Sequence, residues 1–114
     1  MKPIIAFLII VLASISISRF YIDDVIKPGQ EFNGIFVVSN PTDDDVRDVS
    51  VKMYIYDLGV SVISREIDVD EEDHAAAFIN WIVPERTKKG LYLARITAAN
   101  DDERAVRHAY IRIV

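Results

Sequence analysis

The chain of 114 residues contains no cysteine. A disulfide framework, a thiolate zinc site, a lipidated cysteine and a cysteine nucleophile are therefore excluded. Glycine is scarce as well, and the four glycines stand singly at positions 29, 34, 59 and 90. The chain thus lacks a glycine-rich loop of the kind that cradles a phosphate.

Positive charge is also in short supply, with 13 Lys and Arg against 18 Asp and Glu and a net charge of -5. Nucleic-acid recognition needs a stripe of basic residues, and here the basic residues are dispersed. We therefore expect no nucleic-acid partner. The hydrophobic content of 51% and charged content of 27% are typical of one globular domain with a core.

Only two histidines are present. His74 follows an acidic turn, and His108 stands on an outward position of the last predicted strand. Neither has a nucleophile motif nearby or a second histidine at metal-binding spacing. We interpret both as solvated surface residues and predict a protein that is not an enzyme, with no catalytic residue.

The N-terminus holds the one long apolar run, from Ile4 to Ala13, after Lys2 and before small residues that alternate with isoleucine up to Ser18. This order is typical of a secretory signal. Residues 1–18 are predicted to be a signal peptide, cut before Arg19 or at the alternative pair Ser14 and Ser16. The rival interpretation is a short uncleaved anchor, although a spanning helix needs about twenty apolar residues. We expect an extracellular protein at the cell surface, with membrane contact only through residues 1–18 if they are retained.

After residue 18 the sequence changes to short alternating runs separated by turn residues, which is typical of half-buried strands. Seven strands are predicted: Arg19 to Val25, Glu31 to Ser39, Asp48 to Tyr56, Val60 to Val69, Ala75 to Val83, Leu91 to Ala99 and Arg104 to Val114. Seven short strands at this spacing favour an all-β, seven-stranded immunoglobulin-like β-sandwich over residues 19–114.

Polar positions indicate which side of each strand faces the core, because burying an unpaired charge is costly. The predicted inward residues are Phe32, Phe36, Val38, Val49, Val51, Met53, Ile55, Ala77, Ile79, Trp81, Val83, Tyr92, Ala94, Ile96, Ala98, Ala109, Ile111 and Ile113. We expect Trp81 at the centre of this core. Tyr92, two residues after Gly90, is predicted to form a tyrosine corner.

Acidic residues gather in three alternate loops, which emerge at the same end of a sandwich. Lys27, Arg86, Lys88 and Lys89 fall in loops at the other end. One interpretation of the acidic end is a calcium site, since calcium prefers six to eight oxygen ligands. The candidate ligands are Asp43, Asp45, Asp70, Asp73, Asp101 and Asp102. The alternatives are head-to-tail stacking of opposite poles and plain solvation.

The outward side of the third, sixth and seventh predicted strands is unusually apolar for a solvent face. It carries Tyr54, Tyr56, Leu93 and Tyr110, together with Leu91. Tyrosines give large, rigid contact areas and are favoured at interfaces. They are also ordinary cross-strand packing residues, so both interpretations stay open. We take this face as the first candidate for a binding surface.

Several turn and core motifs also resemble a known family. They are the turn from Lys27 to Gln30, the segment Val38-Ser39-Asn40-Pro41-Thr42, the segment from Val46 to Val51 with Tyr54, and Pro84 with Gly90-Leu91-Tyr92. Residues 27–114 are similar to CARDB-type and related immunoglobulin-like domains of prokaryotic, especially archaeal, surface proteins. The resemblance implies the fold and an extracellular setting, and carries no functional residue across.

Together these observations predict a non-enzymatic, secreted or cell-surface module that mediates protein-protein contact or adhesion, by binding a protein partner or by self-association. The alternative is a subunit of an extracellular filament that uses head-to-tail contacts or a donated strand. The donated strand would present Ile15, Ile17, Phe20 and Ile22. We expect no cofactor, apart from calcium if the acidic end binds it.

Overall fold

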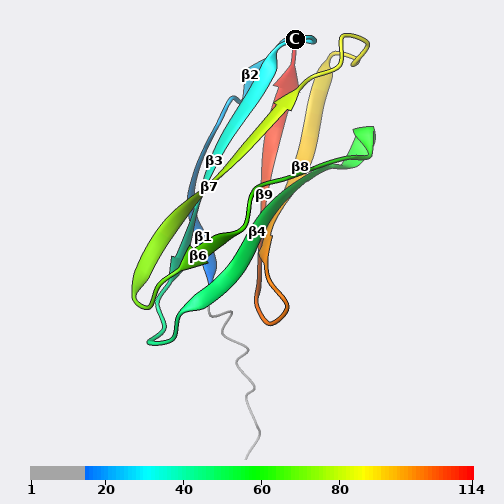
Figure 1. Cartoon of the computed structure of the whole chain (residues 1–114). Coiled ribbons are helices and arrows are strands. Elements are labelled where there is room, and N and C mark those ends of the chain that lie inside the picture. The colour runs from blue at the N-terminus through cyan, green and yellow to red at the C-terminus, as the bar shows by residue number, and fades with distance from the viewer. Residues whose placement is uncertain (1–14) are drawn as a thin grey trace, which may run out of the picture.

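The computed structural model describes residues 15–114, and over this range the chain forms nine strands that pack as two sheets (Figure 1). The strands are β1 (Ser16–Ile22), β2 (Val25–Ile26), β3 (Glu31–Asn40), β4 (Val46–Ile55), β5 (Val60–Ile63), β6 (Ile67–Val69), β7 (Asp73–Ile82), β8 (Gly90–Ala99) and β9 (Arg104–Ile113). A short 3-10 helix, η1 (Tyr56–Leu58), separates β4 from β5. The predicted all-β sandwich is confirmed.

The smaller sheet has the strand order β1-β3-β7. The larger sheet has the order β2-β9-β8-β4-β5, and β6 also pairs with β4. All pairs are antiparallel except the short parallel pair of β2 with β9. This order brings β4, β8 and β9 side by side, so their outward side chains share one face.

Two of the predicted strands are each divided, which raises the number from seven to nine within residues 15–114. The first divides at Asp23 and Asp24, where the chain leaves the smaller sheet and joins the larger one as β2. The fourth divides at residues 64–66, between β5 and β6. The first break moves the chain from one sheet to the other, whereas on both sides of the second break the chain pairs with β4.

The core lies between the sheets and follows the predicted alternation of inward residues. Phe32, Phe36, Val49, Val51 and Met53 are among its fully buried side chains. Gly34 is required beside them, because a Cβ atom there would lie 2.7 Å from Cε2 of Phe36. The inner side of the smaller sheet is thus closely packed at Gly34.

The prediction that Trp81 lies at the centre of the core is wrong. It is only partly buried and packs against the edge of the core, whereas Phe32 and Phe36 are fully buried. The reason is its position, since β7 is an edge strand of the smaller sheet and Trp81 lies one residue before the end of that strand. A ring at such a site has neighbours on fewer sides.

The start of β1 belongs to the sandwich. Ile15 and Ile17 are only 1% and 4% exposed. Ser18 Oγ donates a hydrogen bond to the Val37 carbonyl at 3.3 Å, and Arg107 Nη1 donates one to the Ile17 carbonyl at 3.1 Å. Residues 16–18, which the sequence groups with the hydrophobic segment, therefore form part of the smaller sheet, and Ile15 before them is buried in the core.

The segment considered as a donated strand pairs within its own chain. Ile17, Phe20 and Ile22 lie opposite Val38, Phe36 and Gly34 of β3. The remainder of the predicted signal segment, residues 1–14, lies outside the described residues. Within the part of the chain that the structure describes, no helix has the length and apolar character to cross a membrane.

The predicted tyrosine corner is present at the start of β8. The Tyr92 hydroxyl donates a hydrogen bond to the Lys88 carbonyl at 2.6 Å, and the side chain is largely buried. This contact fixes the loop that carries Arg86, Lys88 and Lys89 to the body of the sandwich.

Candidate binding surface

The outer face of the larger sheet carries the four residues proposed for binding. Leu93 lies directly opposite Tyr110 on neighbouring strands, and Tyr54 lies opposite Arg95. Tyr56 follows β4 in helix η1 and packs against Tyr54. Tyr110 is 59% exposed, while Tyr54 and Leu93 are half-buried. The structure therefore brings all four onto one solvent face.

Two of these tyrosines join Arg95 and His108 in what we name the aromatic cluster: Tyr54, Tyr56, Arg95 and His108. The rings of Tyr54 and Tyr56 meet edge to face, with centroids 5.3 Å apart. The Tyr56 and His108 rings stack at 6.4 Å with an angle of 12° between their planes. Each contact of this kind contributes about 0.5 to 1.5 kcal/mol, so the cluster is ordered before any partner arrives.

Arg95 lies at the centre of the aromatic cluster. Its guanidinium carbon is 5.5 Å from the Tyr54 ring centroid and 5.6 Å from that of Tyr56, which are cation–π distances. Sequence reasoning missed Arg95 and His108 as members of this site, although it placed both outward. The signal that could have found them is strand register, since Arg95 lies opposite both Tyr54 and His108.

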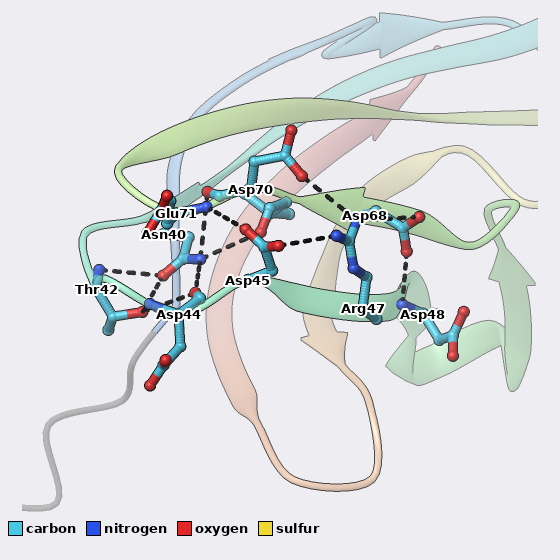
Figure 2. A network of polar contacts seen from close by, with 10 residues as sticks. Asn40, Thr42, Asp44, Asp45, Arg47, Asp48, Asp68, Asp70 and Glu71 are labelled. Carbon is cyan, nitrogen blue, oxygen red and sulfur yellow. Dashed lines mark hydrogen bonds and ion pairs between the residues drawn. The ribbon is translucent and has the colours of Figure 1, made fainter.

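The acidic loops are the second feature that the sequence singled out. They converge at the end of the sandwich drawn in Figure 2. Asp45, Asp48, Asp101 and Asp102 line one surface depression. The backbone N–H of Glu72 donates to the Thr42 carbonyl at 2.9 Å, which ties the loop before β7 to the loop before β4. The predicted gathering of acids at one end is thus present in the fold.

One cation, Arg47, compensates the charge at this end. Its Nη2 atom lies 2.8 Å from Asp45 Oδ2, and its Nη1 atom lies 3.3 Å from Asp70 Oδ1 and 3.6 Å from Asp68 Oδ2 (Figure 2). Asp45 also accepts the Glu71 backbone N–H at 2.8 Å. These carboxylates are therefore engaged in holding loops together.

The buried side chain of Asn40 fixes the same loops (Figure 2). Its Nδ2 atom donates to the carbonyls of Asp44 at 2.7 Å and Val69 at 3.1 Å, and its Oδ1 atom accepts from Thr42. Asn40 is 1% exposed, and its bond to the Val69 carbonyl is fully buried while the others are partly buried. The amide acts as an internal tie between three segments.

The proposed calcium ligands do not form a metal site in the structure. Over residues 15–114, no group of three or more His, Cys, Asp or Glu side chains is arranged to hold a metal ion. Asp45 and Asp70 face Arg47, and Asp73 lies beside His74 with Oδ1 3.7 Å from Nδ1. Asp45 and Asp70 thus have a structural role as partners of Arg47.

The outer face of the smaller sheet carries an apolar row that sequence reasoning did not single out. Tyr21, Ile35 and Phe78 lie opposite one another across β1, β3 and β7. Tyr21 and Phe78 are each 60% exposed. The alternation of β3 and β7 placed Ile35 and Phe78 outward, but their alignment with Tyr21 depends on the bulge in β1, which the sequence does not reveal.

Comparison with known proteins finds no matching family model and no matching curated protein. Among solved structures, an alkylpurine DNA glycosylase from Pseudomonas fluorescens matches 90% of this chain with a TM-score of 0.66 and 13% identity. The chain spans only 31% of that enzyme. A Niemann-Pick type C2 protein from the Japanese carpenter ant matches 89% of this chain and 93% of its own, with a TM-score of 0.66 and 14% identity.

The CARDB domain of a Pyrococcus furiosus protein matches over almost its whole length. Its solution structure has a TM-score of 0.61 and 14% identity, with coverage of 89% of this chain and 93% of that domain. The present chain has the fold of a CARDB domain. A crystal structure of the same Pyrococcus domain, described as a complex with di-metal ions, also matches, with a TM-score of 0.58 and 86% of that chain covered. At this identity the CARDB likeness establishes the fold, as the sequence resemblance implied.

Proposed function

We propose that this CARDB-type domain is a non-enzymatic interaction module that binds a protein partner through the outer face of its larger sheet. The observation that carries the proposal is the aromatic cluster with Tyr110 and Leu93 beside it. Tyrosine and arginine are the residue types that dominate binding energy at protein interfaces. Here they stand together on a face where solvated residues are the norm.

Order within the cluster supports the same proposal. Binding requires side chains to lose conformational freedom, at about 0.5 to 1.5 kcal/mol for each flexible side chain. Tyr54, Tyr56 and Arg95 already hold one another in place through ring and cation–π contacts. A partner that docks on this face therefore contacts side chains that are already ordered, so that less conformational freedom is lost on binding.

We further propose that the domain works outside the cell, at the cell surface. The apolar run from Ile4 to Ala13 after Lys2 supports export. Removal of the leader before Arg19 is not part of this proposal, because Ile15 and Ile17 are buried in the sandwich.

A direct test replaces two tyrosines on different strands of the candidate face, Tyr54 of β4 and Tyr110 of β9. The double variant Tyr54→Ala with Tyr110→Ala is compared with Tyr21→Ala with Phe78→Ala, which removes two rings from the opposite face. We expect the first variant to lose retention on intact cells by at least about tenfold and the second to bind like the parent protein. Equal retention of both variants would exclude the candidate face.

Self-assembly into a filament is the second candidate function. The apolar row of Tyr21, Ile35 and Phe78 favours it, since a second exposed apolar face allows each copy to contact two others and so to form a chain of copies. Sedimentation at rising concentration tests it: growth beyond a monomer that Phe78→Ala abolishes supports assembly, and a constant monomer removes it.

A further inference from the structure

A depression of about 330 Å³ lies on the outer face of the larger sheet, beside the aromatic cluster. It is lined by Ser50, Lys52, Ile63, Arg95, Thr97, Ala99 and Arg104. Its volume lies at the lower end of the range typical of ligand pockets. No acidic residue lines it, although the chain carries more acidic than basic residues.

Strand register explains why the depression exists. Lys52 lies opposite Thr97 and also opposite Ile63, while Ser50 lies opposite Ala99. Short side chains at Ser50, Thr97 and Ala99 leave the middle of the sheet low, and longer side chains stand around it. The long neighbours are Lys52, Ile63, Arg95 and Arg104. Three of these four are cations.

These cations lack acidic partners within the described structure. Over residues 15–114, the ion pairs involve only Arg47 and His74 as the basic members. Lys52, Arg95 and Arg104 therefore direct uncompensated charge into the depression. The acidic loop of residues 101–103 adjoins the depression at Ala99 and Arg104, but its side chains line the neighbouring acidic depression and none of them lines this one.

Arg95 supplies the most specific feature. Its Nε atom is buried and has no hydrogen-bond partner in the part of the chain that the structure describes. A buried donor without a partner costs free energy until an acceptor reaches it. The Tyr54 and Tyr56 rings hold the guanidinium in place, and a guanidinium fork fits a carboxylate with two parallel bonds.

We propose that this depression binds carboxylate side chains from an acidic segment of the protein partner. One carboxylate pairs with Arg95, and a neighbouring one lies between Lys52 and Arg104. This inference rests on the proposed function and names the chemistry of the partner: the tyrosines supply contact area, and the cationic depression selects Asp or Glu. Neutral segments fail because they leave three cations desolvated without compensation.

The test uses the full chain and two synthetic peptides, one of alternating glutamate and glycine and one with glutamine in place of glutamate. We expect the glutamate peptide alone to bind and to move the Arg95 Nε–H signal downfield in nuclear magnetic resonance spectra. Affinity should fall at least about tenfold in Arg95→Gln, less in Arg95→Lys, and steeply with added salt. The matched control is Arg112→Gln, which removes the same charge from the same face outside the depression.

Each of the following results overturns the inference. The first is no binding of the glutamate peptide, or binding that Arg95→Gln and Arg112→Gln weaken equally. The second is binding of an acidic polysaccharide in place of the peptide. The third is self-association of the chain that Arg95→Gln abolishes, which would make a second copy the acidic partner. If Tyr54→Ala with Tyr110→Ala loses cell binding while Arg95→Gln does not, the proposed function stands and this inference fails.

Discussion

The two sheets of the sandwich are alike on the inside and different on the outside. Both inner faces bury large aliphatic and aromatic side chains, such as Phe36 in the smaller sheet and Met53 in the larger one. Outside, the smaller sheet presents the apolar row of Tyr21, Ile35 and Phe78, with no aromatic pair among these three. The larger sheet presents rings interlocked with Arg95 and His108, and cations around a depression.

This difference separates stability from function. A core position contributes through burial, which is similar for both sheets and independent of what the molecule binds. An outer position that is apolar, ordered and close to unpaired cations contributes little to burial. Such an outer position is therefore more informative about function than a core position is. The outer face of the larger sheet has several such positions together.

We expect the largest loss of stability from a deletion that disrupts the first strand of the smaller sheet. Deleting residues 1–18 removes two buried isoleucines and part of the pairing of β1, whereas deleting residues 1–14 leaves both in place. We expect the longer deletion to cost about 4 kcal/mol or more of unfolding free energy. Urea denaturation of the two variants measures the difference. Equal stability would contradict the assignment of residues 15–18 to the sandwich.

The next effect concerns the tie between the sheets. Asn40 ends β3 of the smaller sheet and bonds to carbonyls next to β4 and β6 of the larger one. Asn40→Ala leaves the buried Val69 carbonyl and two partly buried carbonyls without this partner, and we expect a loss of about 3 kcal/mol in urea denaturation. The control is Asn33→Ala on the exposed side of β3, which should change stability by less than about 0.5 kcal/mol. A similar cost for both variants would show that burial does not set the effect.

A smaller effect sharpens the comparison of the outer faces. Tyr54→Ala removes the edge-to-face contact with Tyr56 and the cation–π contact with Arg95, so we expect a loss of about 1 to 2 kcal/mol. Phe78→Ala on the opposite face should cost less, because that ring is 60% exposed and has no ring partner in the described residues. Thermal unfolding distinguishes them. If Phe78→Ala is the more damaging change, the larger sheet's outer face is not the more ordered one.

The smallest effect lies at the acidic end. Arg47→Gln removes three ion pairs, but all of the side chains involved are well exposed. We expect a loss of about 0.5 to 1 kcal/mol at low salt, which shrinks as salt is added. Arg65→Gln serves as a control at an exposed arginine outside these pairs. A salt-independent loss would indicate that Arg47 stabilises by packing.

Much of the fold could be predicted from the sequence because alternation along a strand reports directly on burial. It placed Phe32, Val51, Ile96 and Ile111 inward, and all are buried. It also identified the turn that needs Tyr92. Composition and local pattern suffice for such features, since each depends on residues close together in the chain.

Features that depend on register between distant strands could not be predicted. The contacts of Arg95 with Tyr54 and of Arg47 with Asp68 and Asp70 join residues that are far apart in the sequence. The start of β1 was missed for another reason. Ile15 and Ile17 continue an apolar run, and in the sequence a buried strand at this place has the same apolar pattern as the end of a hydrophobic leader. Trp81 was misplaced because size suggests a central position, while an edge strand leaves it partly exposed.

The central claim is that the outer face of the larger sheet meets a protein partner. Photo-cross-linking tests it most directly, with a photoreactive phenylalanine analogue placed at Tyr110 in one variant and at Tyr21 in the other. Both positions are about equally exposed, so collision alone gives equal labelling. The account predicts a discrete cross-linked protein from position 110, absent from position 21 and lost on adding Tyr54→Ala. Equal products from both positions, or a product from position 21 alone, would contradict it.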